Sequence, residues 1–179
     1  MKFDEQNAQG DSPTCATIVN SFVSENVDLI LANATAPLQA AATGTTDIPI
    51  LGTSVTDYGT ALNIKDWKGT TGVNVSGTSD LAPLDQQAAM IKELFPDKKK
   101  VGLLYCSAEA NSLYQVETIK GYLEKDGYTC TNYSFVDSND IASVVSNAAK
   151  NSDVIYVPTD NTAASNTEVI RNTCVPAKV

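Results

Sequence analysis

Four short segments of this chain gather hydroxyl, amide and carboxylate groups directly after an apolar run. They are residues 33–37, 52–57, 107–112 and 159–162. Apolar runs of this kind are typical of buried strands, and open parallel sheets bind ligands beyond the carboxyl ends of their strands, where helices begin. Side chains of these types hold small polar molecules by hydrogen bonds and by charge. The four segments therefore predict a binding site for a small polar ligand.

Two of the segments suggest opposite charges in that ligand. Residues 107–112 precede a predicted helix, whose free N–H groups and dipole could hold a carboxylate. Asp160 follows an apolar run and could receive an ammonium group. Each feature also fits ordinary helix capping, and both interpretations are open for Thr35, Thr56 and Asp57 as well. A ligand-binding role is favoured over capping because the two predicted lobes each direct polar strand ends toward one cleft.

Several kinds of chemistry have no support in the residues. The chain has no histidine, so it lacks the commonest general base and metal ligand, and no Ser-His or Cys-His nucleophile can form. Its four cysteines lie too far apart for a zinc or CxxC motif. They are expected to be mainly small buried hydrophobes, and the sequence leaves a disulfide between two of them open. No GxSxG motif, Walker loop or strand-linked GxGxxG is present. We therefore expect neither an enzyme nor a bound metal or cofactor.

Charge argues against a nucleic-acid partner. The 179 residues carry a net charge of −9, and the one basic cluster is Lys98-Lys99-Lys100. A nucleic-acid-binding protein would be expected to show a basic stripe, whereas three lysines before an apolar run indicate a solvated turn between a helix and a strand.

Apolar runs alternate with amphipathic stretches along the chain, which predicts an α/β fold with parallel sheets flanked by helices. The expected strands are residues 27–32, 48–51, 101–106, 128–136 and 154–157. The expected helices begin after Asp11, at Thr35, near Leu84, before Val116, after Asp140 and near Asn161, the last running to about residue 172. Residues 52–80 are rich in Gly, Thr, Ser and Asp and are expected to be loop and connection.

An internal repeat predicts two lobes. Residues 26–32 can be laid on residues 151–157, and each copy ends in a polar turn that contains threonine. We therefore expect a first α/β lobe over 1–80 and a second over 81–179. The second copy has an extra strand and helix at about 100–127 without a counterpart in the first. The first lobe is accordingly expected to be incomplete, with its first βα unit missing, and the second to lack its C-terminal part.

The order and spacing of these segments resemble the ABC transporter substrate-binding family, whose members include tryptophan- and tyrosine-binding receptors of bacterial importers. The matching stretches are NAQGD (7–11), VDLILANAT (27–35), IPILGTSVTD (48–57), NVSGTSD (74–80), IKELFPD (91–97), VGLLYCSAEANS (101–112) and VIYVPTDNT (154–162). The resemblance implies a periplasmic-binding-protein fold with hinge strands near 75–82. It also implies an ABC permease partner and an extracytoplasmic location, either periplasmic or as a cell-surface lipoprotein whose lipid anchor is absent from this chain.

By position, the resemblance implies eight ligand-binding residues: Thr35, Thr56 and Asp57 in the first lobe, and Glu109, Asn111, Ser112, Asp160 and Asn161 in the second. The implied ligand is an amino acid with an aromatic or other apolar side chain. Two departures leave ligand identity open: Tyr58 stands where the family usually has proline, and Trp67-Lys68-Gly69 replaces the usual Pro-Gly. A ligand-sensing domain of the same fold in a regulatory protein is the alternative, and an α/β enzyme would require measured turnover.

Overall fold

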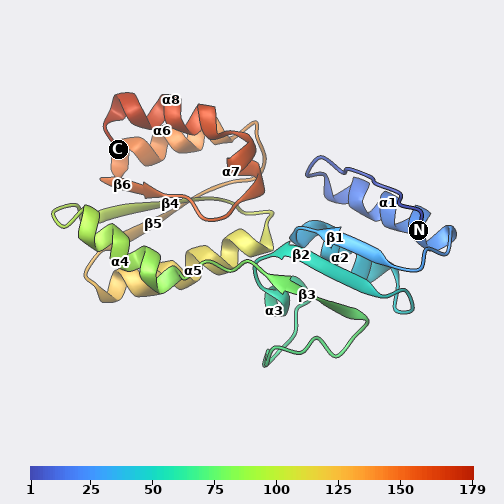
Figure 1. Cartoon of the computed structure of the whole chain (residues 1–179). Helices are drawn as coiled ribbons and strands as arrows, with labels where there is room; N and C mark the ends of the chain where they lie inside the picture. Colours follow the sequence, from blue (N-terminus) through green and yellow to red (C-terminus); the bar gives the residue numbers. More distant parts are fainter. The chain divides into compact units, whose positions relative to one another are not determined.

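The computed structural model describes residues 1–179, which divide into two compact units, Met1–Ala82 and Pro83–Val179. Each unit is built on its own three-stranded parallel sheet with helices packed against it (Figure 1). The α/β class with parallel, helix-flanked sheets that the sequence predicts is thus confirmed. None of the helices is both long and apolar enough to cross a bilayer.

The first unit has the sheet order β1-β2-β3. Its elements are α1 (Ser12–Ser24), β1 (Ile30–Asn33), α2 (Thr35–Gly44), β2 (Ile50–Val55), α3 (Tyr58–Ala61) and β3 (Val75–Ser79). Asp11 caps α1 through its side chain and a proline occupies the first turn, which accounts for the sharp start of that helix. Helix α2 packs against β1 and β2, and α1 packs against α2.

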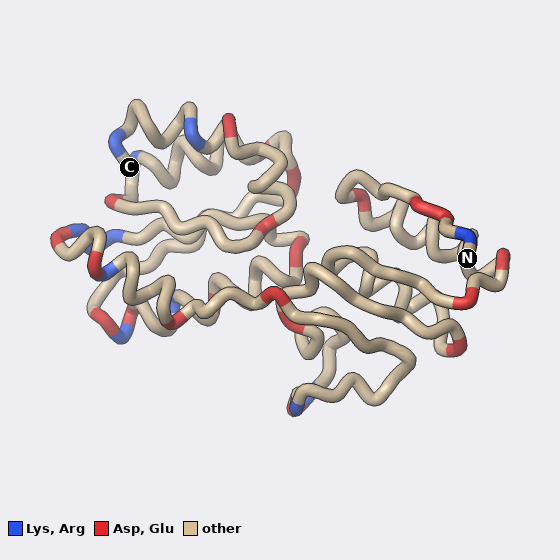
Figure 2. The backbone as a smooth tube through the Cα atoms, viewed as in Figure 1, with Lys and Arg blue, Asp and Glu red and all other residues tan.

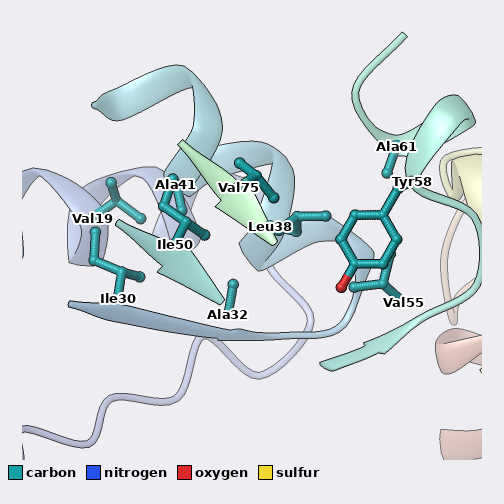
Figure 3. Close-up of a cluster of buried hydrophobic side chains, with 10 residues drawn as sticks. All are labelled: Val19, Ile30, Ala32, Leu38, Ala41, Ile50, Val55, Tyr58, Ala61 and Val75. Carbon is teal, nitrogen blue, oxygen red and sulfur yellow. The ribbon is translucent and has the colours of Figure 1, made fainter. Parts of the chain in front are cut away.

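The core of the first unit lies on the face of the sheet that α2 covers. Ile30 pairs with Ile50, which pairs with Val75, and all three side chains are buried in one cluster with Val19 of α1 and with Leu38 and Ala41 of α2 (Figure 3). On the opposite face Leu31 remains 67% exposed. Alternate residues of a strand point to opposite faces, so a single covering layer buries only every second position.

Tyr58 explains why β3 is hard to recognise in the sequence. Gly52 of β2 pairs with Gly77 of β3, and a Cβ atom on either would lie within 2.4 Å of the Tyr58 hydroxyl. The ring therefore occupies the space that two side chains would otherwise fill, close to Val55 in Figure 3. The Tyr58 hydroxyl also donates to the carbonyl of Thr78, at 3.2 Å.

The expectation that residues 52–80 are loop was therefore wrong in part. Strand β2 continues to Val55, a short helix α3 follows, and β3 occupies Val75–Ser79. The reason is physical: in β3 only Val75 is buried, so the strand shows neither an apolar run nor alternation.

The second unit has the order β5-β4-β6. Its elements are α4 (Leu84–Leu94), β4 (Lys100–Cys106), α5 (Ala110–Lys125), β5 (Thr129–Phe135), α6 (Ile141–Asn151), β6 (Val154–Tyr156), α7 (Asn161–Ser165) and α8 (Thr167–Ala177). Helices α4 and α5 cover one face of the sheet, and α6 and α8 cover the other (Figure 1). The central strand β4 is therefore buried on both faces from Val101 to Cys106.

The single helix expected over 161–172 is instead two helices that meet at Asn166. The Asn166 backbone leaves the helical region, and its side-chain amide donates to the carbonyl of Thr162 at 2.8 Å. Because asparagine bonds readily to nearby backbone groups, it ends α7 after a single turn.

Candidate ligand-binding site

In the first unit, the end of β1 turns directly into α2 through a strained residue. Ala34 has φ 89° and ψ 167°, a region almost confined to glycine, and its N–H donates to the carbonyl of Thr53 at 2.9 Å. No side chain caps α2. The first N–H groups of this helix are therefore available to an external acceptor, and the helix dipole favours a negative one.

Two largely buried threonines of the first unit, Thr35 at this helix start and Thr56 directly after β2, have hydroxyls without a protein partner. Thr35 is 5% exposed and Thr56 is 3% exposed, yet neither side chain makes a hydrogen bond within the protein. Neither hydroxyl oxygen is completely enclosed, because Tyr128 carries the only fully buried side-chain polar atom without a partner. A buried hydroxyl is normally hydrogen-bonded. Both hydroxyls follow strand ends and reach the surface without a protein partner, so each is free to bind water or a ligand.

Asp57 shows the capping interaction that the sequence left open. Its Oδ1 atom accepts from the N–H of Thr60 at 2.7 Å and so caps α3. Oδ2 accepts no hydrogen bond from the protein and remains available.

In the second unit, three elements converge on Asp160. Its Oδ2 accepts from the N–H of Cys106, at the end of β4, and from the hydroxyl of Ser112, in α5, each at 2.7 Å. Its Oδ1 accepts from the N–H of Ala163, in α7, also at 2.7 Å. Asp160 is 3% exposed, and the only ion pair in the structure is Lys92–Asp126. Burial outweighs the three hydrogen bonds and raises the pKa of Asp160.

Glu109 lies beside this carboxylate with a different set of partners. Oε1 accepts from the N–H and hydroxyl of Thr162 at 2.9 and 2.8 Å. Oε2 accepts from the N–H and side-chain amide of Asn161 at 3.0 and 2.7 Å, and from the amide of Asn111 at 3.2 Å. Burial opposes ionisation, but these hydrogen bonds outweigh it and lower the pKa of Glu109.

The five residues that the resemblance implied in the second lobe thus form one hydrogen-bonded cluster. Gln115, which sequence reasoning missed, extends it: the side-chain amide donates to the carbonyl of Thr159 at 3.0 Å, and the N–H of Thr159 donates back to Oε1 at 3.2 Å. The available signal was its place on the buried face of α5, beside Val116 and one turn after Asn111.

Comparisons with known proteins, by sequence and by structure, find similar proteins in several bacteria. A family model described as ABC transporter substrate binding protein matches residues 1–179. A tyrosine-binding protein of Clostridioides difficile (strain R20291) is 39% identical over 170 residues, covering 95% of this chain and 49% of the relative.

Two solved structures are also similar. The ABC domain from Streptococcus pneumoniae in complex with L-Trp has a TM-score of 0.94 at 38% identity, covering 99% of this chain and 62% of that one. A conserved domain protein from Vibrio cholerae has a TM-score of 0.93 at 36% identity, covering 99% and 60%. The chain thus spans about half the length of the curated relative and about three fifths of the two solved structures. The periplasmic-binding-protein fold expected from the sequence is confirmed.

Proposed function

Because the chain belongs to the ABC transporter substrate-binding protein family, we propose that the full-length protein is the receptor of an amino-acid importer and binds an aromatic L-amino acid. Members of this family bind solutes and catalyse no reaction. The observation that carries the proposal is a pair of opposite polar sites: a buried carboxylate without a cation in the second unit, and an uncapped helix start with two unpartnered hydroxyls in the first.

Asp160 is the proposed acceptor for the ligand's ammonium group. A carboxylate offers about four acceptor positions, and the protein fills three of those on Asp160. An ammonium group would take the fourth and supply the cation that this buried charge lacks. Glu109 already accepts five donors, which leaves no position for a ligand.

The ligand's carboxylate is proposed to bind at the start of α2, with Thr35 and Thr56. The start of α5, where the sequence also suggested a carboxylate site, has the Glu109 carboxylate at its N-cap and Asp160 bonded to its first turn. Two negative groups there oppose a third. No acidic residue occupies the first turn of α2, so the helix dipole acts on the anion without that repulsion.

The partner and location follow from the family. Its proteins are extracytoplasmic, and we propose an ABC permease as partner, with the protein either periplasmic or held at the cell surface by a lipid anchor. Substrate-binding relatives favour this function over a ligand-sensing domain.

Tyrosine and tryptophan are the first ligands to test, because one relative is a tyrosine-binding protein and another was solved with L-Trp.

The test is the melting temperature of the full-length protein with and without L-tyrosine, L-tryptophan, L-phenylalanine, glucose and maltose. We expect at least one of the three amino acids to raise it in a concentration-dependent way, because a ligand that binds only the folded state stabilises that state. Stabilisation by a sugar alone would overturn the assignment.

Thr35→Val and Thr56→Val should weaken amino-acid binding without lowering stability. Neither hydroxyl has a protein partner to lose, so the melting temperature should stay the same or rise. A hydrogen bond to a charged group contributes about 1.5–3 kcal/mol, so each change should raise the Kd roughly 10- to 150-fold.

Thr43→Val is the matched control for these two variants, because that hydroxyl bonds to the carbonyl of Gln39 within α2. It should leave the Kd unchanged. Equal Kd values for all three variants and the wild type would remove Thr35 and Thr56 from the site.

A further inference from the structure

We propose that Gln115 and Glu109 are positioning residues that clamp the turn between β6 and α7 and so hold Asp160 and Asn161 in place for the ligand. The expected effect on affinity rests on the proposed function. The clamp itself is a property of the ligand-free protein and can be tested separately.

The turn needs external support because the elements on either side of it are short. Strand β6 has three residues, all only half-buried, at the edge of the sheet, and α7 has five. Elements this short have few hydrogen bonds of their own and open readily. The side chains proposed to meet the ligand nevertheless lie on this segment, so their positions depend on contacts from elsewhere.

Gln115 supplies the first half of the clamp. Its side-chain amide pairs with both backbone groups of Thr159, as a neighbouring strand would, and it is 1% exposed. The amide of Asn111 also donates to the Thr159 carbonyl, at 3.1 Å. Because Thr159 directly precedes Asp160, this pairing fixes the backbone from which the Asp160 carboxylate projects. No other hydrogen bond holds the Thr159 N–H.

Glu109 supplies the second half. It takes both the backbone N–H and the side-chain donor of Asn161 and of Thr162, the first two residues of α7. These N–H groups have no acceptor within their own helix, so Glu109 replaces the missing helical partners. With five donors already bound, the carboxylate cannot accept from a ligand as well. Its part in the site is therefore to position α7.

Removing either half should leave the fold intact but make the turn mobile before ligand arrives. The ligand would then have to order the segment on binding, and that cost appears as lost affinity. Leaving one buried group unpaired at the turn should raise the Kd roughly 10-fold.

The experiment measures hydrogen exchange at single amides of the ligand-free, full-length protein for Gln115→Leu and Glu109→Ala. We expect Gln115→Leu to speed exchange of the Thr159 amide, and Glu109→Ala to speed exchange of the Asn161 and Thr162 amides. Amides of α6 and of β4 from Val101 to Tyr105 should not change in either variant; the Cys106 amide is left out of this control because it donates to Asp160. Glu117→Gln is the control on the same helix, since its carboxylate accepts one hydrogen bond, from the side-chain amide of Asn132 at 3.4 Å, and none from the turn.

The same variants are then titrated with L-tyrosine and with 3-(4-hydroxyphenyl)propanoate, which lacks the ammonium group. Because the clamp acts through Asp160 and Asn161, Gln115→Leu should weaken tyrosine binding more than binding of the analogue, whereas general destabilisation would weaken both equally. Unchanged exchange at the turn overturns the clamp, as does faster exchange with an unchanged Kd. If the wild-type protein binds no amino acid, the proposed function is contradicted. The clamp is then tested by the hydrogen-exchange result alone.

Discussion

Asp160→Ala should abolish measurable amino-acid binding by the full-length protein. The bound ammonium group loses its hydration and needs an ionised acceptor, and Asp160 is the buried carboxylate in the second unit that keeps an acceptor position open. Removing one partner of a buried charge pair costs about 2–5 kcal/mol, which is roughly 30- to 4,000-fold in Kd.

Two further variants separate the loss of a ligand contact from the loss of a helix cap. Asp160→Asn keeps the size of the side chain and one oxygen that can cap α7, so this variant should still fold. It should nevertheless lose most of the affinity for the amino acid, because the negative charge is gone. Asp11→Ala removes an aspartate that caps α1 in the same way but is exposed. It should cost about 1 kcal/mol of stability and leave the Kd unchanged. If Asp160→Asn bound as tightly as the wild type, Asp160 would be only a structural cap.

The pH dependence of binding gives a second readout of the same residue. Burial raises the pKa of Asp160 above the ordinary 3.8, so its ionised form is the one that folding disfavours. Its contribution to stability is therefore fully present below the unfolded pKa and is lost as pH rises through the folded pKa. Ligand binding has the opposite preference, since ammonium requires the ionised carboxylate. We expect the Kd to rise as pH falls through the folded pKa, and Asp160→Asn to remove this dependence.

Gly77→Ala should destabilise the first unit strongly. The glycine has φ 155°, and a Cβ atom there would lie 2.1 Å from the Gly52 carbonyl oxygen and 2.2 Å from the Tyr58 hydroxyl. The carbonyl belongs to the neighbouring strand and cannot move without breaking the sheet. Overpacking of this kind costs about 1–3 kcal/mol, and backbone strain adds to it. Urea unfolding followed by hydrogen exchange of the β1, β2 and β3 amides measures the loss.

Gly121→Ala is the matched control. Gly121 lies inside α5 with nothing within 4 Å of its added Cβ atom. Alanine there should stabilise the protein by about 1 kcal/mol, because glycine is a poor helix former. Gly77→Ala with wild-type stability would show that Tyr58 does not need the pair of glycines beneath it.

The elements that could be predicted from the sequence are those whose buried residues follow a regular spacing. Strand β4 is buried on both faces and appears as an unbroken apolar run, and α4 buries Leu84, Ala88 and Ile91 at helical spacing. Strand β3 could not be predicted in this way. Its two-glycine pairing is set by Tyr58, which lies about twenty residues away in the sequence, and no local pattern reports such a contact.

The candidate site, like the fold, could be predicted from the sequence only in part. Strand ends and helix starts locate Thr35, Thr56 and Asp160 from the sequence, because chain order fixes where they lie in each sheet. The partners of each side chain are long-range and could not be foreseen. Glu109 bonds to residues 161 and 162, and Gln115 bonds to residue 159, across more than forty positions. Such contacts depend on how α5 and α7 pack, so the difference in role between the two acids emerges only from the structure.

A calorimetric titration of the full-length protein tests whether both charged groups of an amino acid are bound. The ligands are L-tyrosine and L-tryptophan, and each is compared with two analogues, one without the carboxylate and one without the ammonium group. Tyramine and tryptamine lack the carboxylate; 3-(4-hydroxyphenyl)propanoate and indole-3-propanoate lack the ammonium group. We predict that at least one of the amino acids binds and that both of its analogues bind at least about 30-fold more weakly, because each leaves one polar site unpaired. Analogues that bind as tightly as the amino acid would contradict the claim that opposite charges at Asp160 and at the start of α2 hold the ligand.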